Sequence, residues 1–269
     1  MAETRSTNYE RKLRQQLRCF LNDDGPHHAI LSALYLQGKK DWHPFLFGGL
    51  LRDILILGLR KGPRDIDVVI ANGSSEELVR ALNPYIRRHT RFGGLQLELR
   101  RWHFDIWPLQ TTWAFLHDRN LAPTPENLPK TTFLNVEAVA VELGPHGEIG
   151  RIVEGGFFEA VRLRTLDINF EENPYPALAA VRSLATAARL RYSISPRLGR
   201  YILETKNRVG SEALVAAQDS HYGFVRFRSK TIQLLTEHID RELDQSPTNP
   251  LRLPDEAHQL PLWQSETTA

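Results

Sequence analysis

Two aspartates separated by one residue, Asp65 and Asp67, stand at the start of the apolar run Val68-Val69-Ile70. If residues 65–70 form a strand, both carboxylates point to the same face, because side chains alternate along a strand. Like charges this close repel each other unless a cation lies between them. Mg2+ is commonly held by one or two carboxylates together with the phosphates of a substrate. The pair therefore predicts a metal site, and a surface Asp-x-Asp turn is the alternative.

A pair of glycines, Gly48-Gly49, lies upstream between the short apolar run 45–47 and a helical pattern of apolar residues over 50–57. Glycines take up backbone dihedrals closed to other residues and let the chain approach a ligand. The start of a helix offers unpaired N–H groups to an anion. Gly48 and Gly49 are therefore predicted to bind the phosphates of a nucleoside triphosphate. Mg2+ carried by that triphosphate would suit a two-metal site, which clamps the attacking and leaving oxygens in phosphoryl transfer.

A third aspartate, Asp105, lies in the second of two predicted strands, 95–99 and 102–107. It is flanked by apolar residues, and a carboxylate in such a position needs a partner. The metal site on a neighbouring strand would provide one. Asp105 is therefore predicted to be a third metal ligand, after the first two aspartates, and the general base for an attacking hydroxyl. The alternative is an edge-strand aspartate paired with Arg101.

Helices and strands both occur along the rest of the chain. Apolar residues at helical spacing and capping residues predict the helices, and the last segment is rich in proline and polar residues. The expected helices cover residues 7–21, 28–37, 50–57, a segment capped by Ser74 or Ser75 that ends at Leu82, 178–192, and most of 196–243. This mixture predicts an α+β protein with a flexible tail over 246–269.

Composition describes an ordinary globular chain of 269 residues with 41% hydrophobic and 25% charged residues, enough to bury the cores of two modest domains. The single cysteine, Cys19, excludes an internal disulfide framework and a cysteine-based zinc site, and it fits a reducing compartment. No apolar run reaches membrane-spanning length, and the N-terminus lacks the apolar core of a signal peptide. We therefore expect a cytoplasmic protein without a membrane partner.

The formal net charge of +2 is too small to indicate nucleic-acid binding by itself. Basic residues gather locally, for example in 60–64, 87–91, 189–200 and 226–230. Scattered arginines most often form solvated faces or ion pairs. A groove that follows RNA, assembled from several of these clusters, is the other interpretation.

The glycine pair followed by Arg52-Asp53, and then Arg64-Asp65-Ile66-Asp67, resembles the GGxxRDxxLG…DxD signature of a nucleotidyltransferase head. CCA-adding enzymes and bacterial poly(A) polymerases share this head, which belongs to the polymerase-β superfamily. The resemblance implies a mixed sheet with flanking helices, followed by a small helical domain. It also implies that the glycines hold the triphosphate, that the two strand aspartates bind magnesium and that Asp105 completes the site. Arg52 resembles the family arginine that supports the head, and it is included among the predicted nucleotide-binding residues.

Weaker similarity extends beyond the head. Residues 148–160 resemble the family's short hairpin ending in GGxxDL, with Glu159 where aspartate is usual. Residues 132–135 resemble its DFTIN segment, without the arginines and the aspartate, and 178–192 resemble its neck helix. The domains expected from this resemblance are a head over 1–168, a neck-like helical domain over 169–245 and the tail over 246–269.

The segment that reads the incoming base departs from the family pattern. The family has Glu-Asp-x-x-Arg, whereas this chain has Glu172-Asn173-Pro174-Tyr175-Pro176. Proline cannot mimic the bidentate fork of arginine, so we do not expect CTP and ATP to be selected by the family's device. Asn173 and Arg182 are predicted to bind the nucleotide in another way. The alternative is that they pack or cap a helix.

The residues and the resemblance together predict a metal-dependent nucleotidyltransferase that moves a nucleotidyl group from an NTP, ATP among them, to an acceptor hydroxyl. The acceptor would be an RNA end or a protein, and the departures argue against standard CCA addition. Family analogy alone suggests a toxin-antitoxin or antiphage role. The alternative, of a different class, is a non-catalytic nucleotide- or RNA-binding module that acts as a subunit or antitoxin. Oligomeric state is not predicted.

Overall fold

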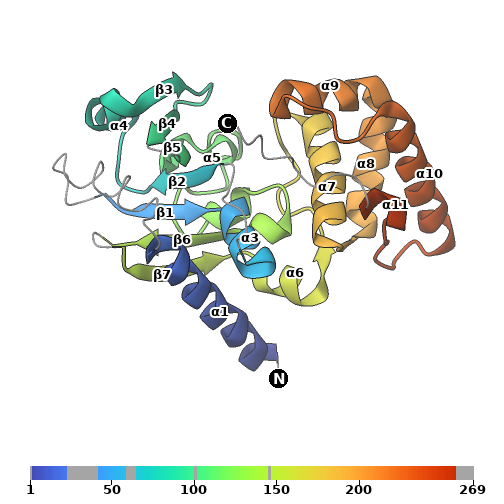
Figure 1. The fold of residues 1–269 in the computed structure, drawn as a ribbon, viewed down its shortest axis with the longest axis horizontal. Helices are drawn as coiled ribbons and strands as arrows, with labels where there is room; N and C mark the ends of the chain where they lie inside the picture. The colour runs from blue at the N-terminus through green and yellow to red at the C-terminus, as the bar shows by residue number, and fades with distance from the viewer. Residues whose placement is uncertain (1, 23–41, 59–64, 100–101, 145–146, 259–269) are drawn as a thin grey trace, which may run out of the picture. The chain divides into compact units, whose positions relative to one another are not determined.

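A computed structural model describes residues 2–22, 42–58, 65–99, 102–144 and 147–258 (Figure 1). Contacts between residues divide the chain into two compact units, Met1–Glu159 and Ala160–Ala269. The first unit contains a mixed sheet and the second is mainly helical, so the predicted α+β class is confirmed. The division lies earlier in the chain than the expected domain boundary at residue 168. In the described part of the chain, no helix is both long and apolar enough to cross a membrane.

Seven strands of the first unit form one sheet in the order β3-β4-β5-β2-β1-β6-β7. Strands β2 and β5 are parallel, and the other neighbours are antiparallel. The strands are β1 (Pro44–Phe47), β2 (Ile66–Ile70), β3 (Ile86–His89), β4 (Leu95–Leu99), β5 (Trp102–Pro108), β6 (Val139–Leu143) and β7 (Ile149–Glu154). Parallel strands require a crossover connection, and here it passes through α4 (Ser75–Leu82) and the hairpin of β3 and β4. The crossover brings the two strands with the predicted aspartates side by side.

Short helices connect these strands and lead toward the second unit. Most lie in the long connection between β5 and β6. They are η1 (Asn83–Tyr85), η2 (Leu109–Thr111), α5 (Trp113–His117), η3 (Leu128–Thr131), η4 (Asn135–Glu137) and α6 (Phe157–Leu163).

One face of the central strands carries a buried apolar cluster. Val69 of β2 pairs with Phe45 of β1, and alternation places Phe47 on the same face. The Phe45 cluster consists of Phe45, Phe47, Val69, Ala71, Leu109, Leu128 and Ala140. Asp67 lies two residues before Val69 and therefore points to this face, at the margin of the cluster.

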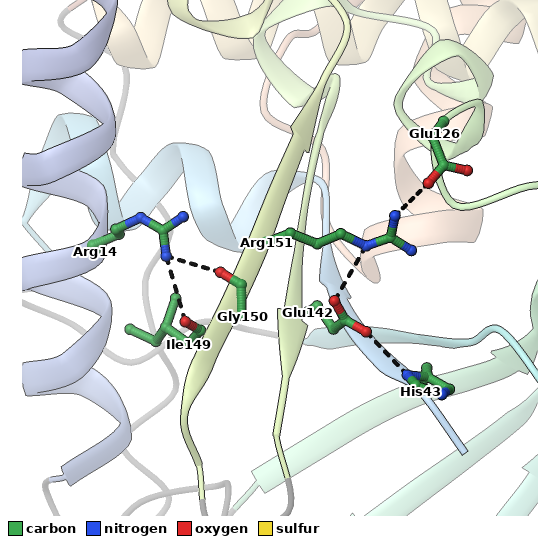
Figure 2. A network of polar contacts seen from close by, with 7 residues as sticks. All are labelled: Arg14, His43, Glu126, Glu142, Ile149, Gly150 and Arg151. Carbon is green, nitrogen blue, oxygen red and sulfur yellow. Dashed lines mark hydrogen bonds and ion pairs between the residues drawn. The ribbon is translucent and has the colours of Figure 1, made fainter. Parts of the chain in front are cut away.

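The N-terminal helix, α1 (Ala2–Asn22), packs against α3 (Gly49–Leu57) and also contacts the edge of the sheet. Arg14 Nη1 donates to the carbonyl oxygens of Gly150 at 2.8 Å and Ile149 at 3.4 Å (Figure 2). Both carbonyls belong to the edge strand β7. The helix therefore satisfies acceptors that an edge strand leaves unpaired.

Arg151 of the same strand joins separate segments of the first unit. Its guanidinium pairs with Glu126, and its Nε lies 3.2 Å from Oε2 of Glu142 in β6 (Figure 2). The other carboxylate oxygen of Glu142 lies 3.0 Å from Nδ1 of His43. A backbone hydrogen bond and the Arg151 guanidinium hold the pKa of Glu126 below its ordinary value. About half of each Arg151, Glu126 and His43 side chain is exposed, so we expect these ion pairs to contribute little to stability.

The second unit consists of helices that pack through small, buried side chains. Helix α7 begins with Pro176 in its first turn, where a missing N–H leaves no hydrogen bond unmade. Ala180, Leu184 and Ala187 of this helix are fully buried. The elements are α7 (Pro176–Leu190), α8 (Pro196–Val209), α9 (Ser211–Tyr222), α10 (Ser229–Gln245), α11 (Asp255–His258) and the parallel pair β8 (Thr165–Leu166) and β9 (Ser193–Ile194).

Residues 246–258 pack against this unit, which differs from the flexible tail expected over 246–269. The backbone of Leu251 exchanges hydrogen bonds of 2.8 and 2.9 Å with Ile194. Leu251 and Leu253 are buried because they fill apolar positions beside the helices. The remainder of the expected tail, and the helix expected over 28–37, lie outside the described residues.

Candidate active site

Two predicted aspartates lie directly opposite each other in the centre of the sheet. The register of β2 and β5 pairs Asp67 with Asp105, and β4 places Gln96 opposite Asp105 on the other side. Residues opposite each other point to the same face, and adjacent strands lie about 4.8 Å apart. The structure therefore forms a row of three oxygen-bearing side chains across three strands. Neither aspartate is fully buried, so both remain reachable from solvent.

The glycine turn lies beside this row. Gly48 has φ 71° and ψ −131°, and its N–H donates to the carbonyl oxygen of Val139 at 3.1 Å. A Cβ built on Gly48 would lie 3.9 Å from Oδ2 of Asp67. A side chain here would be strained by the positive φ and would fill the space next to the carboxylate. The structure thus brings together the phosphate turn and the acidic strand, the two halves of the predicted site.

The helix that follows the turn presents free polar groups to this region. Within the part of the chain that the structure describes, no side chain caps the start of α3, and the amides of Leu51 and Arg52 bond to the Gly48 carbonyl at 3.1 and 3.4 Å. Helix geometry leaves the amides of Gly49 and Leu50 without a partner inside the helix. Such amides and the helix dipole together favour an anion such as a phosphate.

Arg52 is a buried residue below the turn. Its Nε donates to Asp53 Oδ1 at 2.7 Å, and its Nη1 donates to Glu137 Oε1 at 2.5 Å. A Cβ built on Gly49 would lie 3.3 Å from Nη2 of Arg52. The guanidinium is therefore engaged by two carboxylates while it supports the glycine backbone. This places Arg52 as a positioning residue, and direct contact with a nucleotide stays a prediction.

Asp65 lies outside the row. It is exposed and precedes the first residue of β2, so alternation along the strand does not fix its direction. Among the described residues, no group of three His, Cys, Asp or Glu side chains lies close enough to hold a metal ion. The carboxylates that the sheet aligns are those of Asp67 and Asp105, and metal binding by any of the three aspartates stays a prediction. Two carboxylates fit Mg2+ when triphosphate oxygens and water complete the coordination shell.

Two residues of the site were missed by sequence reasoning. Gln96 was predicted to lie in a strand, and no role was assigned to it. Pairing the two strands of the predicted hairpin could have indicated that Gln96 and Asp105 share one face of the sheet. Glu137 is 6% exposed and pairs with Arg52 across a long stretch of sequence. A glutamate inside the apolar segment 136–141 was the available signal, because such a carboxylate needs a cationic partner.

Gly48→Ala is expected to weaken triphosphate binding and to lower the free energy of unfolding by about 1–3 kcal/mol, the cost of a strained backbone conformation. Gly156→Ala is the matched control, since Gly156 has φ +90° with no atom within 4 Å of an added Cβ. Urea unfolding should show strain in both variants, and calorimetry should show weaker triphosphate binding in Gly48→Ala only. Equal triphosphate affinity in the two variants would contradict a phosphate role for this turn.

Asn173, in the second unit, has well-defined structural contacts. Its Oδ1 accepts from the Tyr175 amide at 3.0 Å, and its Nδ2 donates to the Tyr201 hydroxyl at 2.9 Å. These contacts fix the turn before α7, which is a structural role for Asn173, although no side-chain hydrogen bond caps the helix itself. Arg182 is exposed on α7. Nucleotide binding by Asn173 and Arg182 stays a prediction.

Burial raises the pKa of Tyr201 above its ordinary value of 10.0. The folded protein then holds this proton more tightly than the unfolded chain. The contribution to stability is complete below pH 10 and is lost as the pH rises through the raised pKa. We expect the free energy of unfolding to fall less steeply above pH 10 in Tyr201→Phe than in the wild type. Tyr85→Phe, at an exposed tyrosine, should keep the wild-type slope; an unchanged slope in Tyr201→Phe would contradict the assignment.

The aromatic residues near β5 pack within the first unit. Trp107 packs on the Phe45 cluster, and its Nε1 donates to Thr112 Oγ1 at 3.0 Å. Trp113 stacks on His117 with ring centroids 4.2 Å apart. Trp107 therefore has a structural role in the core of the first unit.

Comparison with known proteins supports the fold. No protein-family model and no curated protein matches the sequence. An apo CCA-adding enzyme structure matches with a TM-score of 0.60 and 17% identity, covering 88% of this chain and 56% of that chain. The Thermotoga maritima CCA-adding enzyme complexed with tRNA matches with a TM-score of 0.56, 17% identity and the same two coverages. A tRNA nucleotidyltransferase complexed with a primer tRNA and an incoming ATP analog matches with a TM-score of 0.54 and 16% identity, covering 78% of this chain and 61% of that chain.

The chain has the fold of the CCA-adding enzymes. The resemblance suggested by the glycine and aspartate motifs is confirmed at the level of the fold, although this chain is only 17% identical to these CCA-adding enzymes. The chain spans somewhat more than half the length of these CCA-adding structures. Within this CCA-adding fold, Pro176 occupies the first turn of α7 and offers no side-chain donor to a base.

Proposed function

We propose that the protein is a metal-dependent nucleotidyltransferase that moves a nucleotidyl group from an NTP to an acceptor hydroxyl. The observation that carries this proposal is the pairing of Asp67 with Asp105 on adjacent strands, with the Gly48 turn against Asp67. Carboxylates held together beside an anion-binding turn suit a cation shared with a triphosphate. The fold supports the same reaction class.

The residues of the chain have distinct roles in this reaction. The turn at Gly48 and the first amides of α3 bind phosphate oxygens and orient the triphosphate for in-line attack. Asp67 and Asp105 would hold Mg2+, which neutralises charge on the triphosphate and favours ionisation of the acceptor hydroxyl. Asp105 accepts the proton of that hydroxyl. A bond forms between the acceptor oxygen and the α-phosphorus, the α–β phosphoanhydride bond breaks, and pyrophosphate leaves.

An RNA end is the acceptor we propose. Structures with this fold include one with tRNA, one with CTP, and one with a primer tRNA and an ATP analog, which supports RNA and NTP as the interacting classes. Pro176 in place of the base-reading arginine argues against the alternating CTP and ATP selection of CCA addition. We therefore propose addition of a nucleotide, with ATP as the first candidate, by a different selection rule.

Label transfer tests this function. The purified protein is incubated with Mg2+, total RNA and each of the four NTPs labelled at the α-phosphate. We expect label in RNA with at least one NTP, lost when EDTA removes the metal. Label in the protein itself would identify a protein acceptor instead of RNA. No transfer with any NTP would reject the enzymatic proposal.

A second candidate is a non-catalytic nucleotide- or RNA-binding module. It is favoured by the donor set, since Asp67 and Asp105 face each other without a third acid gathered beside them in the described residues. Calorimetry distinguishes the two functions. Triphosphate binding that is equally tight with Mg2+ and with EDTA would favour the module, and binding that requires Mg2+ would favour the enzyme.

A further inference from the structure

The loop between α9 and α10 contains a buried guanidinium. All three side-chain nitrogens of Arg226 are buried and have no hydrogen-bond partner among the described residues. Arginine carries five N–H donors, and buried donors are paired in nearly all folded proteins. An arginine in this state indicates an acceptor that the described chain does not supply.

The position of Arg226 is fixed by the core of the second unit. Gln218 of α9 is 2% exposed, and its Oε1 accepts from the amides of Arg226 at 3.2 Å and Phe227 at 2.9 Å. Its Nε2 donates to the Phe227 carbonyl at 2.9 Å. Phe227 is fully buried, and the guanidinium carbon of Arg226 lies 5.4 Å from its ring centroid. The loop backbone therefore holds Arg226 in a defined place.

The charges near Arg226 favour an anion. Burial and the positive charge of Arg189, in the last turn of α7, lower the pKa of Arg226. Residues 221–230 include Arg228 and Lys230 and have no acidic residue. A phosphate group has the charge and the several oxygens needed to accept hydrogen bonds from two guanidinium groups, whereas one carboxylate has only two oxygens.

Three aromatic rings precede the same arginine in the chain. The ring of Tyr222 is 4.6 Å from that of His221 and 5.9 Å from that of Phe224. Phe224 is 39% exposed and Val225 is 36% exposed. Basic residues interleaved with aromatic rings are typical of surfaces that bind single-stranded nucleic acid, because each base can stack on a ring.

We propose that Arg226 and Arg189 form a phosphate-binding site for single-stranded RNA, with Phe224 as an adjacent stacking surface for a base. Because the guanidinium nitrogens are covered, a phosphate reaches them only when neighbouring side chains move aside. The site rests on the proposed function in taking RNA as the acceptor. It requires neither Asp67 nor Asp105, so it can be tested separately.

Fluorescence anisotropy with a labelled single-stranded RNA of about 12 nucleotides tests the site in the full-length protein, without NTP or metal. Arg226→Gln is expected to raise Kd about fivefold to tenfold and to reduce the slope of log K against log salt concentration by about 1. Arg252→Gln removes an exposed arginine from the same unit and should change Kd less than about twofold. RNA binding that is unchanged in Arg226→Gln would overturn the proposal.

Thermal unfolding separates RNA binding from a structural role. Loss of a buried guanidinium that has no hydrogen-bond partner among the described residues should leave Tm unchanged or raise it. Inorganic phosphate should raise the Tm of the wild type but not that of Arg226→Gln. A lower Tm with unchanged RNA affinity would assign Arg226 to the fold. Stabilisation by polyglutamate but not by phosphate or RNA would indicate an acidic protein partner, and either result refutes the site.

The catalytically impaired variant keeps the two proposals distinguishable. Asp67→Asn should bind the RNA with wild-type affinity while it loses nucleotidyl transfer. If the wild type transfers no nucleotide to RNA but Arg226→Gln still weakens RNA binding, the proposed function fails and the phosphate site stands.

Discussion

Asp67→Asn is expected to lower the rate of nucleotidyl transfer on the order of 10³-fold. Asparagine keeps the size of the side chain but removes the charge opposite Asp105 and beside the Gly48 turn. The cation that stabilises the charge developing in phosphoryl transfer then loses one of its two carboxylate ligands, and electrostatic losses of this kind reach such a size. Steady-state transfer of label from the preferred NTP measures the effect.

Three variants control this experiment. Asp105→Asn should lose a similar amount of activity, because the two carboxylates form one donor set. Asp65→Asn should lose less, since Asp65 precedes the strand and is exposed. Glu76→Gln, which neutralises an exposed acid on α4, should retain full activity. An Asp67→Asn enzyme with wild-type turnover would remove the acidic row from the mechanism.

Arg52→Met is expected to lower the free energy of unfolding by about 3–5 kcal/mol. Arg52 and Glu137 have 8% of each side chain exposed, and Asp53 also bonds to the same guanidinium. Removing the cation leaves Glu137 buried beneath the glycine turn without the positive charge that pairs with it. Urea unfolding followed by circular dichroism measures the loss, and triphosphate binding should weaken because the Gly49 backbone loses its support.

An exposed pair provides the matched comparison. Arg87 pairs with Glu98 at 2.8 Å, but 70% of its side chain is exposed, so Arg87→Met should cost less than about 1 kcal/mol. Replacing both buried partners, as in Arg52→Met with Glu137→Leu, should restore part of the stability lost in the single variant. Equal costs for Arg52→Met and Arg87→Met would show that the buried pair does not stabilise the head.

Local patterns were sufficient to predict the parts of the site that are close in sequence. The glycine pair needs only its own turn geometry, and the apolar run after Asp67 is a strand in any arrangement of the sheet. The pairing of Asp105 with Asp67 depends on strand register. It is set by the buried neighbours Ile66 and Phe104, and a shift by one residue would turn Asp105 to the other face.

Long-range contacts explain what could not be predicted. Glu137 is recognisable as an unusual buried carboxylate, but its partner Arg52 becomes known only when η4 and α3 are placed together. The segment after residue 246 has the composition of a loose tail, and burial of Leu251 requires β9 as its pairing partner. For Asp65, a local pattern predicted more than the strand itself provides. The spacing of Asp65 and Asp67 suggested a shared strand face, but the strand begins only at Ile66.

The most direct test of the account is a double-mutant cycle on Mg2+-dependent binding of a non-hydrolysable triphosphate, measured by calorimetry. The central claim is that Asp67 and Asp105 hold one cation together with the triphosphate bound at the Gly48 turn. We expect wild-type binding to require Mg2+, each single asparagine variant to lose that dependence, and the double variant to bind no more weakly than either single variant. Binding that is independent of Mg2+ in the wild type, or losses that simply add, would contradict the claim.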